Sequence, residues 1–146
     1  MRGTSRQPWA QDIRFRLRFE RGVRQAFPEI KIQETGRTFK HEVIYRLTVP
    51  VPGYEPRQLT IRIQNAYRPW PRVYADGPTE SPHRYSAHHL CMWHPKDPPD
   101  RVWLPEDGLL TLIRYAQEHL FREAWWRETG EWIGEQAPHE TPKEDG

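Results

Sequence analysis

The stretch HEVIYRLTVPVPGYEPRQLTIRI (residues 41–63) decides the fold, because it places two runs of strand-forming residues around a proline-glycine turn. The first run, 41–49, is rich in β-branched residues and ends before Pro50 and Pro52-Gly53. The second run, 59–63, alternates apolar with polar residues, which puts its apolar side chains on one face. The sequence therefore predicts two antiparallel strands with one face on a core.

Two further runs extend this pair to a sheet. Residues 30–34 alternate in the same way and end at Gly36, and residues 72–75 form a short fourth run. Short connections between consecutive strands favour antiparallel neighbours. We therefore expect a four-stranded antiparallel meander.

The segment before the meander, 9–27, carries two competing patterns. Apolar residues alternate with arginines over 13–19, as in a strand, yet apolar residues also recur every four positions, as in a helix. The length of the segment and the stop at Pro28 favour a helix over a strand. Its arginines would then lie on a solvated face or form a docking surface for a partner.

A second helical pattern follows the meander. It begins at Pro105-Glu106-Asp107, repeats apolar residues at three- and four-residue spacing and runs toward Thr129-Gly130, with a final short piece at Trp132 and Ile133. We therefore expect an α+β fold with an N-terminal helix, the four-stranded meander, and C-terminal helices packed on one side of the sheet.

Composition and charge limit the classes of protein to which this chain can belong. Its 146 residues suit one domain, placed at 9–136 between a flexible lead-in (1–8) and a flexible polar tail (137–146). A net charge of +2 argues against broad electrostatic binding of nucleic acid. A single cysteine excludes an internal disulfide. The sequence has neither a signal peptide nor an apolar run of membrane length, so we expect a cytoplasmic protein.

The irregular stretch 79–102 holds the single cysteine, Cys91. A thiol attacks a carbonyl as the thiolate, and a nearby cation or hydrogen-bond donor favours that form. Four histidines within eight residues of Cys91 supply candidates: His83, His88, His89 and His94. The stretch therefore predicts a cysteine nucleophile.

Two other interpretations of Cys91 stay open. It could be a small core residue between Leu90 and Met92, because free cysteine is often buried. It could also ligate zinc with His94 and one of the two adjacent histidines, although the chain has no pair of cysteines and adjacent side chains diverge.

Neighbours of Cys91 are candidates for support of the site. His94 could polarise the thiol or lie solvated beside Pro95. Tyr85 could brace the loop through its hydroxyl or simply pack, and Trp93 could line a groove for the acyl group.

The order of these features resembles the ubiquitin-conjugating enzymes, a family with an N-terminal helix, a four-stranded meander, a catalytic cysteine and C-terminal helices. Residues 67–73 (YRPWPRV) resemble the proline-rich crossing of that family. Ser81-Pro82-His83 stands where the family has His-Pro-Asn, eight residues before Cys91. Leu90-Cys91-Met92 resembles Ile-Cys-Leu, and Trp103-Leu104-Pro105 resembles Trp-Ser-Pro.

A narrower resemblance is to bacterial members of this fold encoded in antiphage CBASS operons of the short type II kind. It is carried by His83-Arg84-Tyr85, by 90–95 with Asp97, and by 129–134 with 137–139. Such proteins sit beside a cyclic-dinucleotide synthase related to cGAS and lack a separate activating-enzyme domain. The resemblance implies that this chain modifies or primes that nucleotidyltransferase through the C-terminus of the synthase.

The resemblance also implies roles for single residues. Cys91 would accept the C-terminal acyl group of a protein partner as a thioester and pass it to an amine. His83 replaces the Asn of the family, where it could stabilise the oxyanion, brace the loop or activate the thiol. Trp103 would support the site, and the insertion at 95–100 would reshape its rim.

This chemistry requires no metal and no small cofactor, and the sequence has no Gly-rich phosphate loop to bind ATP. Two alternatives come from other classes of protein. A non-catalytic adaptor of the same fold would hold the synthase or another partner through an aromatic and proline-rich surface. The other alternative is a cysteine hydrolase. The lack of a recognisable cysteine-histidine protease signature argues against it.

Overall fold

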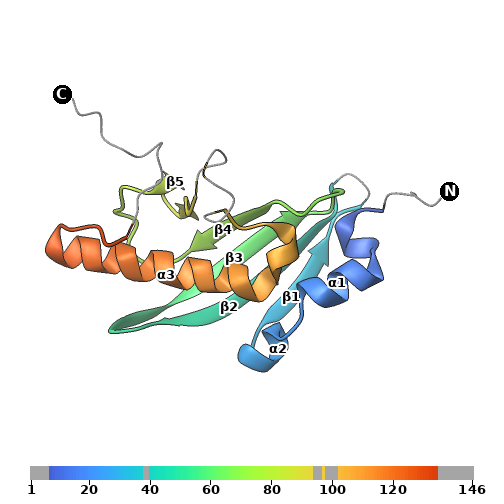
Figure 1. Ribbon diagram of the computed structural model, residues 1–146, viewed down its shortest axis with the longest axis horizontal. Helices are drawn as coiled ribbons and strands as arrows, with labels where there is room; N and C mark the ends of the chain where they lie inside the picture. Colours follow the sequence, from blue (N-terminus) through green and yellow to red (C-terminus); the bar gives the residue numbers. More distant parts are fainter. Residues whose placement is uncertain (1–6, 38–39, 94–96, 98–101, 135–146) are drawn as a thin grey trace.

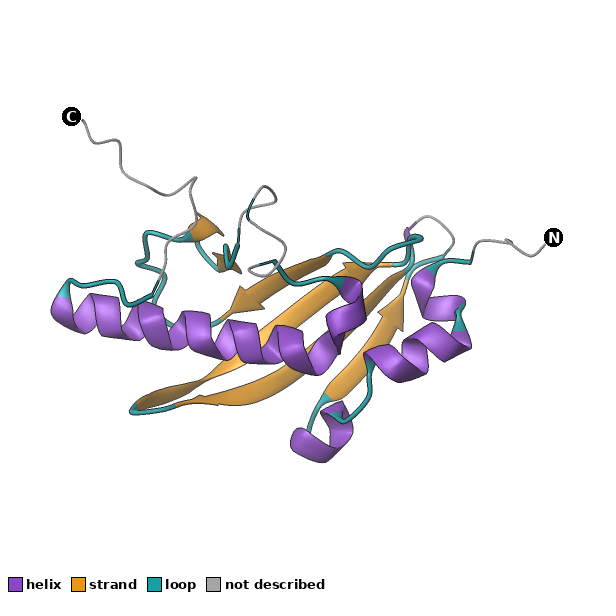
Figure 2. Ribbon diagram, viewed as in Figure 1, coloured by secondary structure: helices purple, strands orange, loops and turns teal. Residues whose placement is uncertain are grey.

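A computed structural model describes residues 7–37, 40–93, 97 and 102–134, in which a long helix crosses one face of an antiparallel sheet (Figure 1). Short helices from the N-terminal segment lie beside the first strand (Figure 2). The predicted α+β class is therefore correct, and the arrangement is consistent with the fold that the resemblance implied.

The N-terminal segment is helical, as predicted, but it is not one helix. It forms a 3₁₀ turn η1 (Trp9–Gln11), helix α1 (Ile13–Phe19) and the single turn α2 (Val23–Ala26). The structure thus decides for helix over strand at residues 13–19, and it corrects the expectation of one helix across the segment.

Local interactions set these boundaries. The side chain of Asp12 accepts a hydrogen bond from the amide of Phe15 at 3.2 Å and so caps α1. Gly22 takes the left-handed conformation, with φ at +78°, and breaks the helix between α1 and α2. The segment stays helical up to Ala26, just before Pro28.

The four predicted strands are present and pair in chain order. They are β1 (Lys31–Thr35), β2 (Glu42–Val51), β3 (Tyr54–Gln64) and β4 (Pro71–Ala75), each antiparallel to the next. The alternation of apolar residues fixes the register of β2 and β3, where Tyr45 faces Ile61. The predicted meander is confirmed.

Among the described residues the sheet has six strands rather than the predicted four. A hairpin of β5 (Arg84–Ser86) and β6 (His89–Leu90) joins β4 through His89 and Tyr74, so the strand order is β1-β2-β3-β4-β6-β5. Strands of 3 and 2 residues are too short to show an alternating pattern, which is why the sequence did not reveal them. The hairpin anchors the cysteine-bearing stretch to the sheet.

One long helix, α3 (Gly108–Thr129), follows a 3₁₀ turn η4 (Pro105–Asp107). The predicted start and the predicted stop at Gly130 are confirmed, and Gly130 caps α3 at φ +82°. The expectation of several C-terminal helices is wrong within the described residues, because the chain after Gly130 is not helical and runs back beside α3 (Figure 2).

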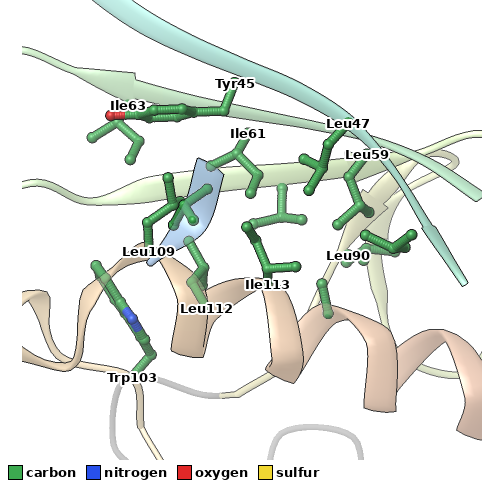
Figure 3. Packing of buried hydrophobic residues seen from close by; sticks show 14 of the residues in the cluster. Tyr45, Leu47, Leu59, Ile61, Ile63, Leu90, Trp103, Leu109, Leu112 and Ile113 are labelled. Atoms are coloured by element: carbon green, nitrogen blue, oxygen red, sulfur yellow. The ribbon is translucent and has the colours of Figure 1, made fainter. Parts of the chain in front are cut away.

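The core lies between the sheet and α3 (Figure 3). Removal of apolar surface from water drives this packing. The sheet contributes Tyr45, Leu47, Leu59, Ile61 and Ile63, and α3 contributes Leu109, Leu112 and Ile113. Trp103 is fully buried at the start of α3, where its indole N–H donates a hydrogen bond to the carbonyl of Gly108 at 2.8 Å.

Candidate active site

Cys91 directly follows β6, the strand of the hairpin that lies between β4 and β5 in the sheet. Its amide donates a hydrogen bond to the carbonyl of His83 at 3.2 Å. One residue before it, Leu90 pairs with Arg84 in the hairpin. The backbone of Cys91 is therefore held between the sheet and the loop that contains His83.

The thiol of Cys91 is buried, with 2% of the residue exposed. Its sulfur lies 3.9 Å from the carbonyl oxygen of Trp93, which also accepts a hydrogen bond from the Tyr85 hydroxyl at 3.3 Å. Burial raises the pKa of the Cys91 thiol, the hydrogen bond from Tyr85 lowers it, and the negative charge of Asp97 raises it; the net pKa is raised. The resting thiol is thus protonated at neutral pH and must lose its proton to react.

Tyr85 is positioned to assist that loss. Its hydroxyl and the Cys91 sulfur both point to one carbonyl oxygen, that of Trp93, to which the hydroxyl donates a hydrogen bond. Burial raises the pKa of Tyr85 to about 12, and the hydrogen bond to Cys91 raises it as well. Tyr85 therefore keeps its proton at neutral pH and can donate it in a hydrogen bond to the sulfur.

The structure brings the main chain of His83 to Cys91 and the ring of His83 to α3. The carbonyl accepts hydrogen bonds from the amide of Cys91 and from Nε2 of His119, at 3.2 and 3.1 Å. The ring is buried, with its centroid 4.2 Å from the ring of Trp132. The hydroxyl of Ser81, in the tripeptide region, accepts a hydrogen bond from the amide of His83 at 3.0 Å.

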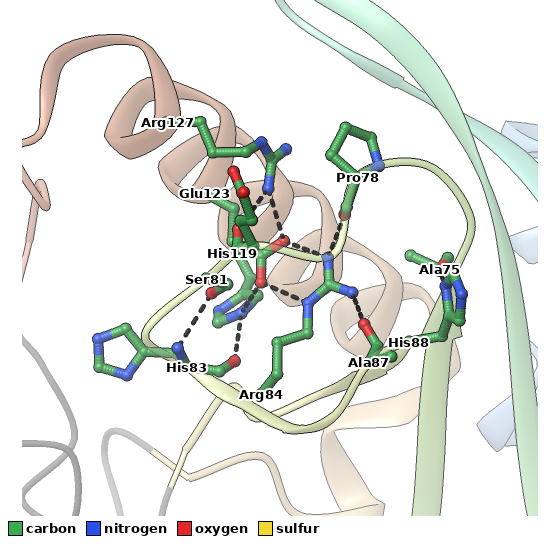
Figure 4. A network of polar contacts seen from close by, with 11 residues as sticks. Ala75, Pro78, Ser81, His83, Arg84, Ala87, His88, His119, Glu123 and Arg127 are labelled. Carbon is green, nitrogen blue, oxygen red and sulfur yellow. Dashed lines mark hydrogen bonds and ion pairs between the residues drawn. The ribbon is translucent and has the colours of Figure 1, made fainter.

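A buried ionic network behind the cysteine loop was not predicted (Figure 4). Glu123 of α3 is fully buried and pairs with Arg84 of β5 through two contacts of 2.8 and 2.5 Å. Nε2 of His119 also donates to Glu123, at 3.0 Å, and because its other partner is a carbonyl this nitrogen carries the proton. Burial would raise the pKa of Glu123, but the hydrogen bonds from Arg84 and His119 bring it down to about 2.

The same network ties α3 to both ends of the loop that precedes Cys91. Arg84 donates to the carbonyls of Ala87 at 2.5 Å and Pro78 at 3.3 Å. Arg127, one turn beyond Glu123, donates to the carbonyl of Glu80 at 2.8 Å. The signal in the sequence was a charged residue at position 123, three residues after buried Leu120 on the apolar face of the helix.

The side chains of the other predicted site residues that the structure describes have partners other than the thiol. His94 lies outside the described residues. Trp103 lies behind the site: its ring centroid is 6.3 Å from that of Trp93, whose carbonyl faces the thiol. Nδ1 of His88 pairs with the carbonyl of Ala75 at 2.9 Å, and the ring of His89 packs 4.8 Å from that of Tyr85.

Within the described part of the chain, no group of three His, Cys, Asp or Glu side chains is arranged to hold a metal ion. The zinc interpretation therefore has no ligand set among those residues. No helix in the same residues is long and apolar enough to span a membrane.

Comparison with known protein families matches residues 14–140 to the family described as Type II CBASS E2 protein. The chain belongs to this family. No curated protein and no solved structure gives a significant match. The resemblance read from the sequence is thereby confirmed at the level of the family, and the chain is a CBASS E2-like protein of antiphage defence.

Proposed function

We propose that this CBASS E2 protein is a cysteine-dependent acyl transferase. Cys91 accepts the C-terminal acyl group of a protein partner as a thioester and passes it to an amine. The observation that carries the proposal is the place of Cys91, directly after β6 with its sulfur and the Tyr85 hydroxyl at the same carbonyl oxygen, in a chain of an E2 family. A hydroxyl at this place favours the thiolate that the reaction needs.

Loading begins when the Cys91 thiol loses its proton. The thiolate attacks the carbonyl carbon of an activated C-terminal residue, a carbon–sulfur bond forms, and the bond to the leaving group breaks. Tyr85 donates a hydrogen bond to the sulfur during this step. In the second half an amine attacks the thioester carbonyl and loses a proton, and the Cys91 thiolate departs and is protonated.

His83 serves this reaction through its main chain, because its carbonyl holds the amide of Cys91. The oxyanion role of its ring stays a prediction. His83→Phe keeps an aromatic ring against Trp132 and removes the ring N–H donors. If this variant has the unfolding temperature of wild type but forms the thioester more slowly, the result supports a role of the ring. An unchanged rate would refute that role.

The proposed donor is the C-terminus of a cGAS-like nucleotidyltransferase in the cytoplasm, and the acceptor is an amine-bearing partner. The donor must arrive activated, because this sequence has no Gly-rich phosphate loop for ATP. The choice of donor follows from the family, whose members act in CBASS.

A non-reducing gel of the chain mixed with a nucleotidyltransferase whose C-terminus carries a thioester of a small thiol tests the proposal. We expect an adduct that thiols cleave, that is absent in Cys91→Ala, and that becomes resistant to thiols in Cys91→Ser, where the linkage is an ester. No adduct in wild type, together with intact defence by Cys91→Ala, would refute the transferase.

A non-catalytic adaptor is the second candidate, and the burial of Cys91 and its raised thiol pKa favour it. If the chain is an adaptor, wild type and Cys91→Ala bind the nucleotidyltransferase equally well. The two proteins then also protect cells equally. A transferase loses protection in Cys91→Ala even when binding is retained, so co-precipitation and phage challenge of the same variants separate the two.

A further inference from the structure

We infer that the groove beside Cys91 selects acyl donors that carry a bulky, uncharged apolar side chain at the penultimate residue of their C-terminal tail. The inference rests on the proposed function and adds the class of donor to it. A donor tail ending in two small residues would leave the groove empty.

The groove adjoins the cysteine along the chain. Leu90 and Met92, on either side of Cys91, both line it, and so does Trp93, whose carbonyl oxygen lies 3.9 Å from the sulfur. Tyr85, whose hydroxyl donates to the same carbonyl at 3.3 Å, forms part of its wall. A donor tail that delivers its last carbonyl carbon to Cys91 passes these residues, and we therefore take the donor tail as the occupant.

The walls of the groove are aromatic and partly uncovered. On one side the ring of Trp70 meets that of Trp93 edge to face at 6.2 Å. On the other side Tyr85 lies 4.8 Å from His89. Trp70 is 53% exposed and Tyr85 is 56% exposed, so an apolar side chain between them would remove apolar surface of both from water.

Charge in the groove selects against basic side chains. Arg72 lines it and is the charged member of the described lining at neutral pH, since burial and the charge of Arg72 lower the pKa of His89. Glu42 pairs with Arg72 at 3.0 Å and with Arg62 at 2.8 Å, so one carboxylate offsets two guanidinium groups and the local charge stays positive. Repulsion disfavours lysine or arginine in the tail, and an apolar residue fits best.

The size of the groove points to one side chain rather than to a cofactor. Its volume is about 270 Å³. Sites for small molecules usually enclose about 300–1,000 Å³. The groove is therefore suited to anchoring a single residue of an extended tail.

Peptide thioesters test the inference without an activating enzyme. We would offer the chain three peptides of one sequence that end in Gly-Gly, Leu-Gly or Arg-Gly, each as a thioester of a small thiol. The Cys91 thiolate attacks the thioester carbonyl, a new carbon–sulfur bond forms, and the small thiol leaves as a thiolate that takes up a proton. Intact-protein mass spectrometry follows loading, with Cys91→Ala as the blank.

We expect the Leu-Gly peptide to load about tenfold faster than Gly-Gly or Arg-Gly at low peptide concentration. Trp70→Ala should lose this preference, so that the Leu-Gly and Gly-Gly peptides load at equal rates. Leu17→Ala, which removes an exposed apolar side chain from α1, is the matched control and should keep the preference.

The outcomes separate the two proposals. Loading of all three peptides at equal rates, or a preference that Trp70→Ala leaves unchanged, overturns the groove inference and leaves the transferase standing. Absence of loading by any peptide, with Cys91 still open to alkylation in the unfolded chain, overturns both.

Discussion

At the end of β6 the Tyr85 hydroxyl and the Cys91 sulfur meet at the carbonyl oxygen of Trp93, and the hydroxyl opposes the effect of burial on the pKa of the thiol. Burial raises the pKa of Cys91, whereas the bond from Tyr85 lowers it. Tyr85→Phe keeps the ring and removes the bond, so the thiol pKa rises further. We expect alkylation by iodoacetamide to slow at neutral pH and its pH profile to move to higher pH, as measured by intact mass.

Tyr67→Phe is the control for this substitution, because it removes a hydroxyl from another exposed tyrosine in the proline-rich crossing. It should leave the pH profile of alkylation where it is. If Tyr85→Phe gives the same profile as wild type, the hydroxyl does not set the reactivity of the thiol.

At the scale of single residues, the sequence did not predict the direction in which side chains point. The position of Cys91 followed from spacing, and the candidacy of Tyr85 followed from nearness in the chain. Several roles stayed open for the ring of His83, and its contact with Trp132, which is 49 residues away in sequence, was not foreseen. Contacts between distant segments decide where a buried ring points, and one sequence does not reveal them.

Among the elements, α3 is the support of the cysteine loop, and Glu123 is its main point of attachment. Glu123→Gln leaves Arg84 buried without the charge that balances it. Loss of one partner of a buried ion pair costs about 3–5 kcal/mol of unfolding free energy. We expect a loss of this size in chemical denaturation, and slower loading of Cys91 under conditions where the variant stays folded.

Glu118→Gln on the exposed face of the same helix is the matched control. It makes the same change, from a carboxylate to an amide, at a position outside the network. Equal stabilities of the two variants would show that the buried pair contributes no more than a surface carboxylate.

The Glu123 network also predicts how stability depends on pH. The pKa of Glu123 falls from 4.5 to about 2 on folding, so its contribution is complete above about pH 4.5 and is lost as the pH falls toward 2. A shift of this size corresponds to about 3 kcal/mol. We therefore expect the difference in unfolding free energy between Glu118→Gln and Glu123→Gln to be constant near neutrality and to shrink below pH 4.5. A difference that does not change with pH would contradict this assignment.

Elements were predicted best where periodic patterns were long. The strands β2 and β3 and the helix α3 were found from alternation and from helical spacing. The hairpin of β5 and β6 has 3 and 2 residues and is defined by its partner β4, so no local pattern marks it. The break at Gly22 was hidden because apolar residues keep their helical spacing across it.

At the scale of the whole molecule, the chain after α3 closes the fold. The ring of Trp132 lies 4.2 Å from that of His83 and 5.6 Å from that of His119, so the last described turn covers the loop and the helix together. The sequence indicated a final short piece at Trp132 and Ile133. It could not show that Trp132 leaves the helix to reach the cysteine loop, because that path depends on the cap at Gly130.

Two shortened chains test the predicted domain limits and the role of Trp132 together. A chain of residues 9–136 keeps every buried residue of the described core, including Trp9, whose indole N–H donates to Gln64 at 2.9 Å. Its unfolding temperature should match that of the full chain in calorimetry. A chain of residues 9–131 lacks Trp132 and exposes the ring of His83, which should cost about 2 kcal/mol and lower the unfolding temperature by roughly 5–10 °C. Equal unfolding temperatures for the two shortened chains would mean that Trp132 does not stabilise the cysteine loop, and a large loss in the 9–136 chain would show that the domain extends beyond these limits.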